Sequence, residues 1–560
     1  MKTWIKGSTY KSIAILAVLT IGLLSPIPNQ TQAQTDTGPA VVIAMAPLNE
    51  QFNDIDYLAK AASEDIGQMS GLIRMQATGF LRGIDMDKPM GAFLYFEDAE
   101  TEPEWLAFVP LKNMDDLLDN IANWADVEED GDMVTVIPDN GEEIMMRKSG
   151  KFVFVSTNEK RLKELPENPQ KQLDSMGGYN VGARLFMQRV PEDLRNMMIE
   201  TIQDGAESGI DDIDDELQAE LQRAQVELQM AQMKELILET DELMIGMNAD
   251  KAGKRIVFDV NMSGKEGSNF EKRITAGKSA GKSSFAGFLM GKTSFNANMC
   301  VGMMKNDIDI YLKSMKDTRE SVMGKIEDDE LDEKEAELAT KLTNTLFDAM
   351  EETLKEGKLD AGAVIMTDKA INGAIGMRIT DPKKVEAAVK EMVASAEGDL
   401  KDKDIQFNLN SGSHRGVNMH EIMIQVDNDE DIHDYVGDQI KVILGIGEKE
   451  VYVAFGQDPM ELLKKAMDAS ASGETKNALE TNLFLAPIMK FAANAADEEM
   501  LEKMADTLSE KGNDRVRIAA VYGKRDMKTQ FEIQDGILSL IGVAAENLQG
   551  MMGGGGGGDF

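Results

Sequence analysis

Short runs of alternating hydrophobic and polar residues along this chain predict strands that lead into capped helices. In residues 450–467 (EVYVAFGQDPMELLKKAM), an alternating strand precedes Asp458 as the N-cap and Pro459 as the first helical residue. Residues 151–165 (KFVFVSTNEKRLKEL) have the same form, with Ser156 and Glu159 at the spacing of a capping box. The two segments lie in different halves of the chain and predict a repeated unit.

Other segments correspond between the two halves in the same order. Strands are predicted at 91–96 and at 361–366, and each is followed by a strand that leads into a helix, with Asn113 and Asp381 as the N-caps. Later in each half, 180–190 parallels 482–489, and 243–262 parallels 516–533. This shared order predicts a tandem duplication of a whole domain.

Turn signals between neighbouring strands favour an antiparallel sheet. Residues 133–137 and 143–146 flank Asp139-Asn140-Gly141, and Asn-Gly between two such runs is typical of a β-hairpin. Strand meanders with packed helices indicate the α+β class. We expect two similar domains, each a mainly antiparallel sheet with packed helices. The predicted divisions are a first domain at 34–274, a flexible basic linker at 275–284, a second domain at 285–545 and a disordered Gly-rich tail at 546–560.

Each half also contains a long polar helical segment. Residues 214–240 carry an apolar stripe at steps of four and three, as in a short coiled coil, and residues 327–356 are similarly charged. Both patterns are typical of solvent-covered domain helices. A homodimer formed through these long helices is the alternative.

The N-terminus has the three regions of a secretory signal peptide. Residues 1–11 carry three lysines, residues 12–24 are apolar, and residues 25–33 end in Thr31-Gln32-Ala33 as the expected cleavage site. We therefore expect cleavage after Ala33 and an exported protein, periplasmic or secreted. The apolar run is short, and no later stretch is long enough to predict a membrane span after the signal is removed.

Charge and cysteine content limit the classes of protein. The chain has a net charge of −40, which becomes −43 on removal of the signal because three lysines and no acidic residue are lost. Such a surface repels nucleic acid and anionic lipid. With Cys300 as the single cysteine, no disulfide within the chain is possible, and its apolar neighbours predict a buried small hydrophobe.

Three catalytic strings occur near the predicted linker. Ser279 lies within a GxSxG string and also begins an SxxK string, but a predicted helix precedes it where a nucleophile elbow needs a strand. The Gly-Lys-Ser/Thr strings at 277, 281 and 291 lack the first glycine of a phosphate-binding loop. A flexible basic linker explains all three better than catalysis does.

Metal-binding patterns are equally incomplete. His414, His420 and His433 fall within twenty residues, but their spacings match no zinc pattern, and a surface turn and a sheet face explain them better. Residues 126–132 (DVEEDGD) begin like a calcium loop but lack its final Glu, which favours a helix-to-strand turn. Most of the 39 methionines lie on predicted strands or apolar helix faces, where Met fills gaps, so they favour core packing over copper binding.

The Ala-containing leader end, the acidic single-Cys body, the paired α+β halves and the segment HRGVNMHEIMI at 414–424 are similar to uncharacterised exported proteins of planctomycete-type bacteria. The resemblance implies no activity, no cofactor and no catalytic residue. We expect a non-catalytic binding or structural component of the cell envelope or periplasm, with an unknown protein or ligand as partner. The alternatives are a hydrolase, for which Ser413, His414 and His420 are the first residues to test, and a weak calcium-binding protein.

Overall fold

The structure is a computed structural model that describes much of the chain from residue 38 to residue 545. Gaps in the description fall at 100, 139–140, 142, 167–168, 175, 209–225, 227–229, 329–332, 368–369, 403–404, 427–437 and 497. The predicted signal peptide, the Gly-rich tail, His433 and most of the stripe at 214–240 lie outside the described residues. Those predictions therefore stay predictions.

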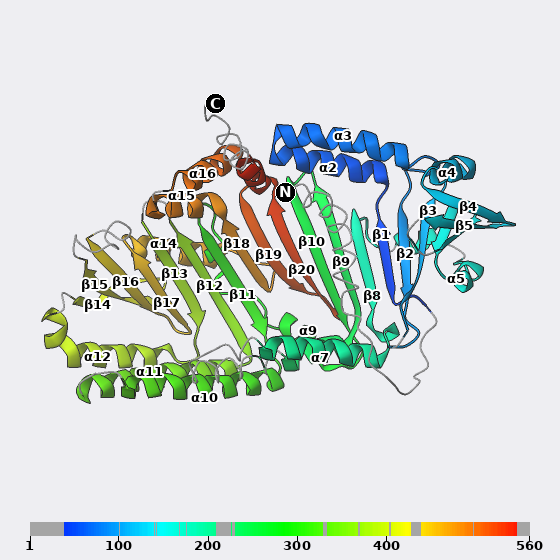
Figure 1. Ribbon diagram of the computed structural model, residues 1–560. Helices are drawn as coiled ribbons and strands as arrows, with labels where there is room; N and C mark the ends of the chain where they lie inside the picture. The colour runs from blue at the N-terminus through cyan, green and yellow to red at the C-terminus, as the bar shows by residue number, and fades with distance from the viewer. Residues whose placement is uncertain are drawn as a thin grey trace, which may run out of the picture.

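One continuous antiparallel sheet runs through the molecule (Figure 1). From one edge to the other, its strands are β4 (Ala125–Asp130), β5 (Met133–Pro138), β6 (Ile144–Ser149), β7 (Phe152–Ser156), β3 (Glu104–Pro110), β2 (Met90–Tyr95), β1 (Val41–Met45), β8 (Val181–Phe186), β9 (Thr240–Asp250), β10 (Arg255–Gly264), β20 (Asp526–Gln534), β19 (Arg515–Tyr522), β18 (Leu479–Phe484), β11 (Phe295–Gly302), β12 (Lys358–Met366), β13 (Asn372–Arg378), β17 (Glu450–Gly456), β16 (Gln439–Ile446), β15 (Val417–Gln425) and β14 (Ile405–His414). This architecture confirms the predicted α+β class with an antiparallel sheet.

The strand order is the same in both halves of the chain. Read inward from its edge, the first half runs β4-β5-β6-β7-β3-β2-β1-β8-β9-β10, and the second runs β14-β15-β16-β17-β13-β12-β11-β18-β19-β20. The halves meet where β10 pairs with β20, and there Phe258 lies directly opposite Phe531. The halves therefore share one sheet, an arrangement that the sequence did not predict.

Helices gather along the two ends of the strands (Figure 1). One end carries α2 (Leu48–Ala62), α3 (Glu64–Phe80), α15 (Leu485–Ala496) and α16 (Glu499–Lys511), and the other carries α7 (Glu192–Ser208), α9 (Asn269–Lys278), α10 (Lys305–Asp328), α11 (Glu333–Lys355) and α12 (Pro382–Asp402). Shorter helices are α4 (Met114–Ile121), α5 (Glu159–Lys163), α6 (Pro169–Asp174) and α14 (Pro459–Ser472), with 3-10 turns η1 (Met187–Arg189), η2 (Ala286–Phe288) and η3 (Asp535–Leu538).

The predicted polar helix at 327–356 divides between two helices. α10 ends at Asp328 and α11 begins at Glu333. They pack on each other, and Arg319 of α10 binds Asn344 and Asp348 of α11. The sequence pattern did not show this division because both helices have the same charged composition. Dimerisation through the long helices stays a prediction.

The predicted flexible linker at 275–284 is wrong in its first part. Ser268 caps α9 by accepting a hydrogen bond from the Glu271 N–H, and the helix continues to Lys278. The rest is held against the sheet, since Ser283 Oγ donates to Asp360 Oδ1 at 2.6 Å and the Ser284 N–H donates to Asp360 Oδ2. A run of small and basic residues therefore does not by itself indicate a flexible linker.

Two further local predictions are corrected. The N-cap of α5 is Asn158, which accepts from the Lys160 N–H, whereas Ser156 Oγ bonds to the Asn158 N–H and the Trp105 carbonyl, so no capping box forms. Residues 126–132 form most of β4 and its hairpin turn into β5, with Gly131 at φ 66°, and not a helix-to-strand turn. Charged residues suit β4 because it is an edge strand.

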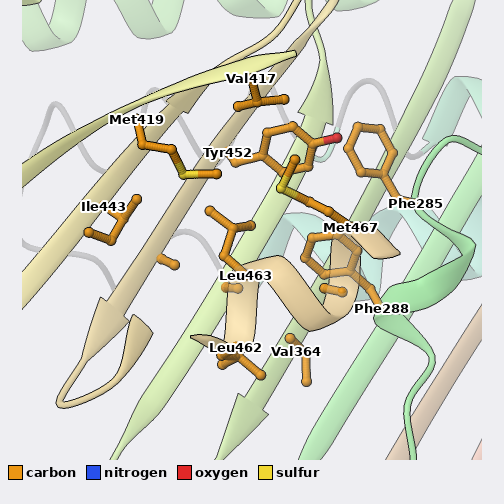
Figure 2. Packing of buried hydrophobic residues seen from close by; sticks show 13 residues of the cluster. Phe285, Phe288, Val364, Val417, Met419, Ile443, Tyr452, Leu462, Leu463 and Met467 are labelled. Carbon is orange, nitrogen blue, oxygen red and sulfur yellow. The ribbon is translucent and has the colours of Figure 1, made fainter. Parts of the chain in front are cut away.

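Two apolar cores lie on one face of the sheet, one in the outer part of each half. In the second half, Leu462, Leu463 and Met467 of α14 and the phenylalanines of the 285–288 segment pack on the sheet (Figure 2). The Phe285 and Tyr452 rings lie 5.7 Å apart, edge to face. In the first half, a second cluster contains Phe93, Phe108, Phe154, Leu162 and Leu173, among others, under α5 and α6. We call this side of the sheet the covered face.

Candidate binding surface

The opposite side of the sheet carries a continuous apolar surface, which we call the open face. Strand registers place one residue from each of twelve neighbouring strands in a single row across it. The row from β17 to β2 is Val453, Ile375, Ala363, Ala297, Thr481, Ile518, Phe531, Phe258, Met247, Val181, Met45 and Met90. Because side chains alternate along a strand, residues two positions away point to the same side.

The regularly paired part of the open face lacks charge, and the one acidic residue at its margin is Asp241, at the bulged end of β9. Its regularly paired outward positions on the described strands hold Val, Ile, Leu, Met, Phe, Ala and Gly, with Thr481, Thr529 and Tyr522 as the polar residues. In a chain with a net charge of −40, a surface of this extent with a carboxylate only at its margin is not a typical solvated face.

Large side chains on the open face remain accessible to water. The exposed fraction is 48% for Ile375, 39% for Val453, 38% for Phe258 and 37% for Phe531. Isolated exposed apolar residues are ordinary, but a contiguous apolar area marks an interaction site. The open face is therefore the strongest candidate binding surface in the described part of the chain.

Behind the centre of the open face, the covered face is polar. Asn296, Asn482, Arg517 and Glu532 follow one another across β11, β18, β19 and β20 on that side. Asn296, Asn482 and Glu532 are each buried. The central strands thus direct polar side chains inward and apolar side chains outward.

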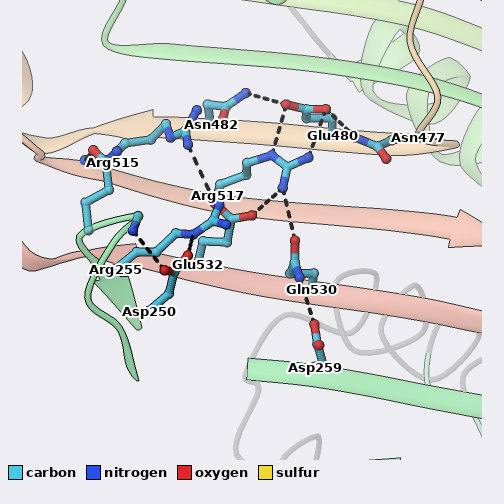
Figure 3. A network of polar contacts seen from close by, with 12 residues as sticks. Asp250, Arg255, Asp259, Asn477, Glu480, Asn482, Arg515, Arg517, Gln530 and Glu532 are labelled. Carbon is cyan, nitrogen blue, oxygen red and sulfur yellow. Dashed lines mark hydrogen bonds and ion pairs between the residues drawn. The ribbon is translucent and has the colours of Figure 1, made fainter. Parts of the chain in front are cut away.

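Arginines from both halves of the chain surround Glu532 (Figure 3). Arg255 Nη1 lies 2.8 Å from Glu532 Oε2, Arg517 Nη1 lies 2.6 Å from Oε1, and Arg515 Nη2 lies 3.6 Å from Oε2. Arg517 also donates to both carboxylate oxygens of Glu480. A buried charge is tolerable only when it is paired and hydrogen-bonded in this way.

A second carboxylate, Asp259 of β10, links the halves beside this network. It accepts hydrogen bonds from Gln530 and from the Tyr179 hydroxyl, and Lys528 Nζ lies 2.8 Å from Oδ2. Burial would raise the pKa of Asp259, but the hydrogen bonds and the Lys528 charge outweigh it and lower the pKa. Burial and the Asp259 bond raise the pKa of Tyr179 to about 12. The Tyr179 ring lies against Gly246, where any side chain would collide with it.

The described histidines form no shared site. His420 is buried on β15, where Nδ1 accepts from the Asn410 N–H and Nε2 lies 3.1 Å from Glu386 Oε1 of α12. Burial lowers its pKa despite the neighbouring carboxylate. His414, at the end of β14, instead bonds to Asp468 at 2.9 Å. His420 lies on a sheet face, as predicted, whereas His414 lies in a strand and not in a turn, because β14 extends further than its apolar pattern indicates.

The other predicted motif residues have local structural roles. Ser279 is the C-cap of α9 and donates to the Ala276 carbonyl, so this GxSxG string follows a helix. Cys300 is buried, as predicted, and burial raises the pKa of its thiol. Within the described residues, no three His, Cys, Asp or Glu side chains gather closely enough to hold a metal ion. None of the described helices is long and apolar enough to cross a membrane.

Comparison with known proteins identified no relative of this chain. No family model matches the chain, and neither the curated proteins nor the solved structures contain a match. Functional inference therefore depends on the open face and the polar network behind it.

Sequence reasoning missed the open face although its signal was present. In β11 the sequence FNANMCVG alternates apolar residues with Asn and Gly, which reads as a strand with an apolar core side. The structure reverses this assignment for the asparagines: Asn296 and Asn298 are buried, and Phe295, Ala297 and Met299 are only partly so. Alternation identifies two sides of a strand, but it does not say which side other elements cover.

Proposed function

We propose that this chain is an exported, non-catalytic protein of the cell envelope or periplasm that holds a partner against its open face. The observation that supports this proposal is the uncharged row across twelve strands, in which residues such as Ile375 and Phe258 are more than a third exposed. Covering such a surface removes apolar area from water, which is favourable. A tandem duplication would account for the repeated strand order and for the width of the face.

The candidate catalytic residues do not favour a hydrolase. His420 donates towards Glu386 beneath α12, and His414 is engaged with Asp468. Ser413 pairs opposite Asn418 on the neighbouring strand β15, which places it in a sheet edge and not in a strand-to-helix turn. The arrangement therefore supports binding over acyl transfer.

Methionine oxidation in intact cells of the source organism tests the proposal. Met377 on the open face is 39% exposed, and Met500 on α16 is 45% exposed, so the two form a matched pair. After a short pulse of hydrogen peroxide, mass spectrometry would measure the sulfoxide fraction at each position. We expect Met377 to be protected several-fold relative to Met500. The same sample should show a mature N-terminus at Gln34.

Equal oxidation of Met377 and Met500 in cells would mean that the open face has no partner there. Met75 on α3, which is 67% exposed, provides the upper reference for an accessible methionine. A protein that retains residues 1–33 would instead contradict export by signal cleavage, whatever the oxidation pattern.

A further inference from the structure

The open face is large enough to form a stable protein interface. Twelve strands spaced about 4.8 Å apart extend across roughly 55 Å, and the outward residues of each strand span roughly 20 Å, which gives about 1,100 Å². The largest apolar patch of an ordinary monomer is about 300–600 Å². A standard specific interface uses about 800 Å² of each partner.

The partner of the open face must itself be broad, apolar and uncharged. Away from Asp241 at the bulged end of β9, the described strands offer no carboxylate or ammonium group there to pair with a charged ligand. Two surface hollows in the described part of the chain lie elsewhere and have charged linings, which include Lys464 and Asp468 of α14 in one and Glu502 of α16 in the other. A sheet face without an enclosing wall also leaves one side of a bound acyl chain in water, so it does not enclose a small apolar ligand.

A second copy of this chain supplies a surface with all of these properties. Two antiparallel sheets pack face to face about 10 Å apart, with interdigitated side chains. Most homodimers use the same patch on both partners. Phe258 and Phe531 lie opposite each other where the two halves meet, so four phenylalanines from two copies would lie near the centre, where aromatic residues contribute most to binding.

The edges of the sheet are poorly suited to self-association. On β4, Asp126, Glu128, Glu129 and Asp130 are exposed, and at the other edge the pairing of β14 with β15 is interrupted by a register shift after Asn408. Charged residues and irregular pairing are the features that oppose edge-to-edge addition of strands. Self-association therefore favours the open face over either edge.

We propose that the open face is the interface of a homodimer in which two copies stack their sheets face to face, with Phe258 and Phe531 near the two-fold axis. This inference rests on the proposed function and names its partner. Each sheet then has the outer parts of one face covered by its own helices and the other face covered by the second copy.

Sedimentation velocity of the purified mature protein over a range of micromolar concentrations tests the dimer. We expect twice the chain mass for the wild type and the single-chain mass for the double variant Phe258→Glu, Phe531→Glu. The matched control is Val521→Glu, because Val521 is 40% exposed and points to the opposite side of the central sheet. The control should remain a dimer.

A second pair of substitutions separates loss of the interface from loss of the fold. Ile375→Glu with Val453→Glu lies on the same face but away from the Phe pair, and both residues are well exposed. Circular dichroism at the concentration of each run would confirm that a monomeric variant is folded. A wild type that is monomeric throughout the range overturns the dimer, and a dimer that survives both pairs overturns its assignment to the open face.

The oxidation experiment in cells distinguishes failure of the dimer from failure of the proposed function. If Met377 is protected in cells while the purified wild type is monomeric, the open face has a different partner and the proposed function stands. If Met377 is as reactive as Met500 in cells, the proposed function fails first, and the dimer fails with it.

Discussion

The two faces of the central strands are built from opposite residue types. On the covered face, Glu532 and Asp259 are buried charges, each held by several partners. On the open face, the neighbouring positions Phe531 and Phe258 are apolar and more than a third exposed. In the outer parts of the sheet, by contrast, the covered face is apolar.

This difference shows that the outer and central parts of the covered face have separate tasks. Apolar packing under α5, α6 and α14 stabilises each half without specifying how the halves join. The polar network joins them, because Arg255 and Asp259 come from the first half and Glu532 and Lys528 from the second. Charged hydrogen bonds require particular partners in particular positions, so they favour this register of β10 on β20 over shifted alternatives.

Among the substitutions proposed here, removal of the Glu532 carboxylate should lower the unfolding free energy the most. In Glu532→Ala, three arginines lose their shared partner, and we expect about 3–5 kcal/mol of lost unfolding free energy, as for other broken buried ion pairs. Urea denaturation would measure it. Thr529→Ala, on the same strand but on the open face, serves as the control and should change stability by less than about 0.5 kcal/mol. Equal effects of the two substitutions would contradict the contrast.

Loss of the Tyr179 hydroxyl should have a smaller effect. Tyr179→Phe keeps the ring on Gly246 but removes a hydrogen bond to a carboxylate, for which we expect about 1.5–3 kcal/mol. Tyr311→Phe, at an exposed position on α10, is the matched control. Thermal unfolding would compare both with the wild type, and a Tyr179→Phe protein as stable as its control would mean that this bond does not help to hold Asp259 at the junction.

Acid should weaken the junction gradually. The pKa values of Asp259 and Glu480 are lowered in the folded protein because hydrogen bonds from Lys528, Arg517 and other donors outweigh burial. The stability they contribute is therefore complete above their unfolded pKa values of about 4 and is lost as the pH falls through the folded values. Urea midpoints between pH 7 and pH 3 would show this loss, and Asp259→Asn with Glu480→Gln should flatten the curve. An unchanged slope in that variant would assign the acid sensitivity to other groups.

Local patterns predicted much of the fold. The alternation in residues 450–456, the Asn113 cap and the hairpin of β5 and β6 all appear in the structure. The meeting of β10 and β20 did not follow from the sequence, because pairing of segments so far apart leaves no local pattern. The polarity of the covered face was also hidden, since Arg517 and Glu532 read as ordinary exposed charges on alternating strands.

Pairing of β10 with β20 also determines when the fold can be completed. Nine strands separate these two along the chain, so β10 is paired with β9 alone, and its other edge remains unpaired until nearly all of the protein is available. Contacts between such distant segments form slowly, and unpaired strand edges recruit other chains during that time. A chain that ends before Asp526 would keep this edge permanently and leave Arg255 and Asp259 without their β20 partners. Assembly of the two halves is therefore controlled by the last strand to emerge.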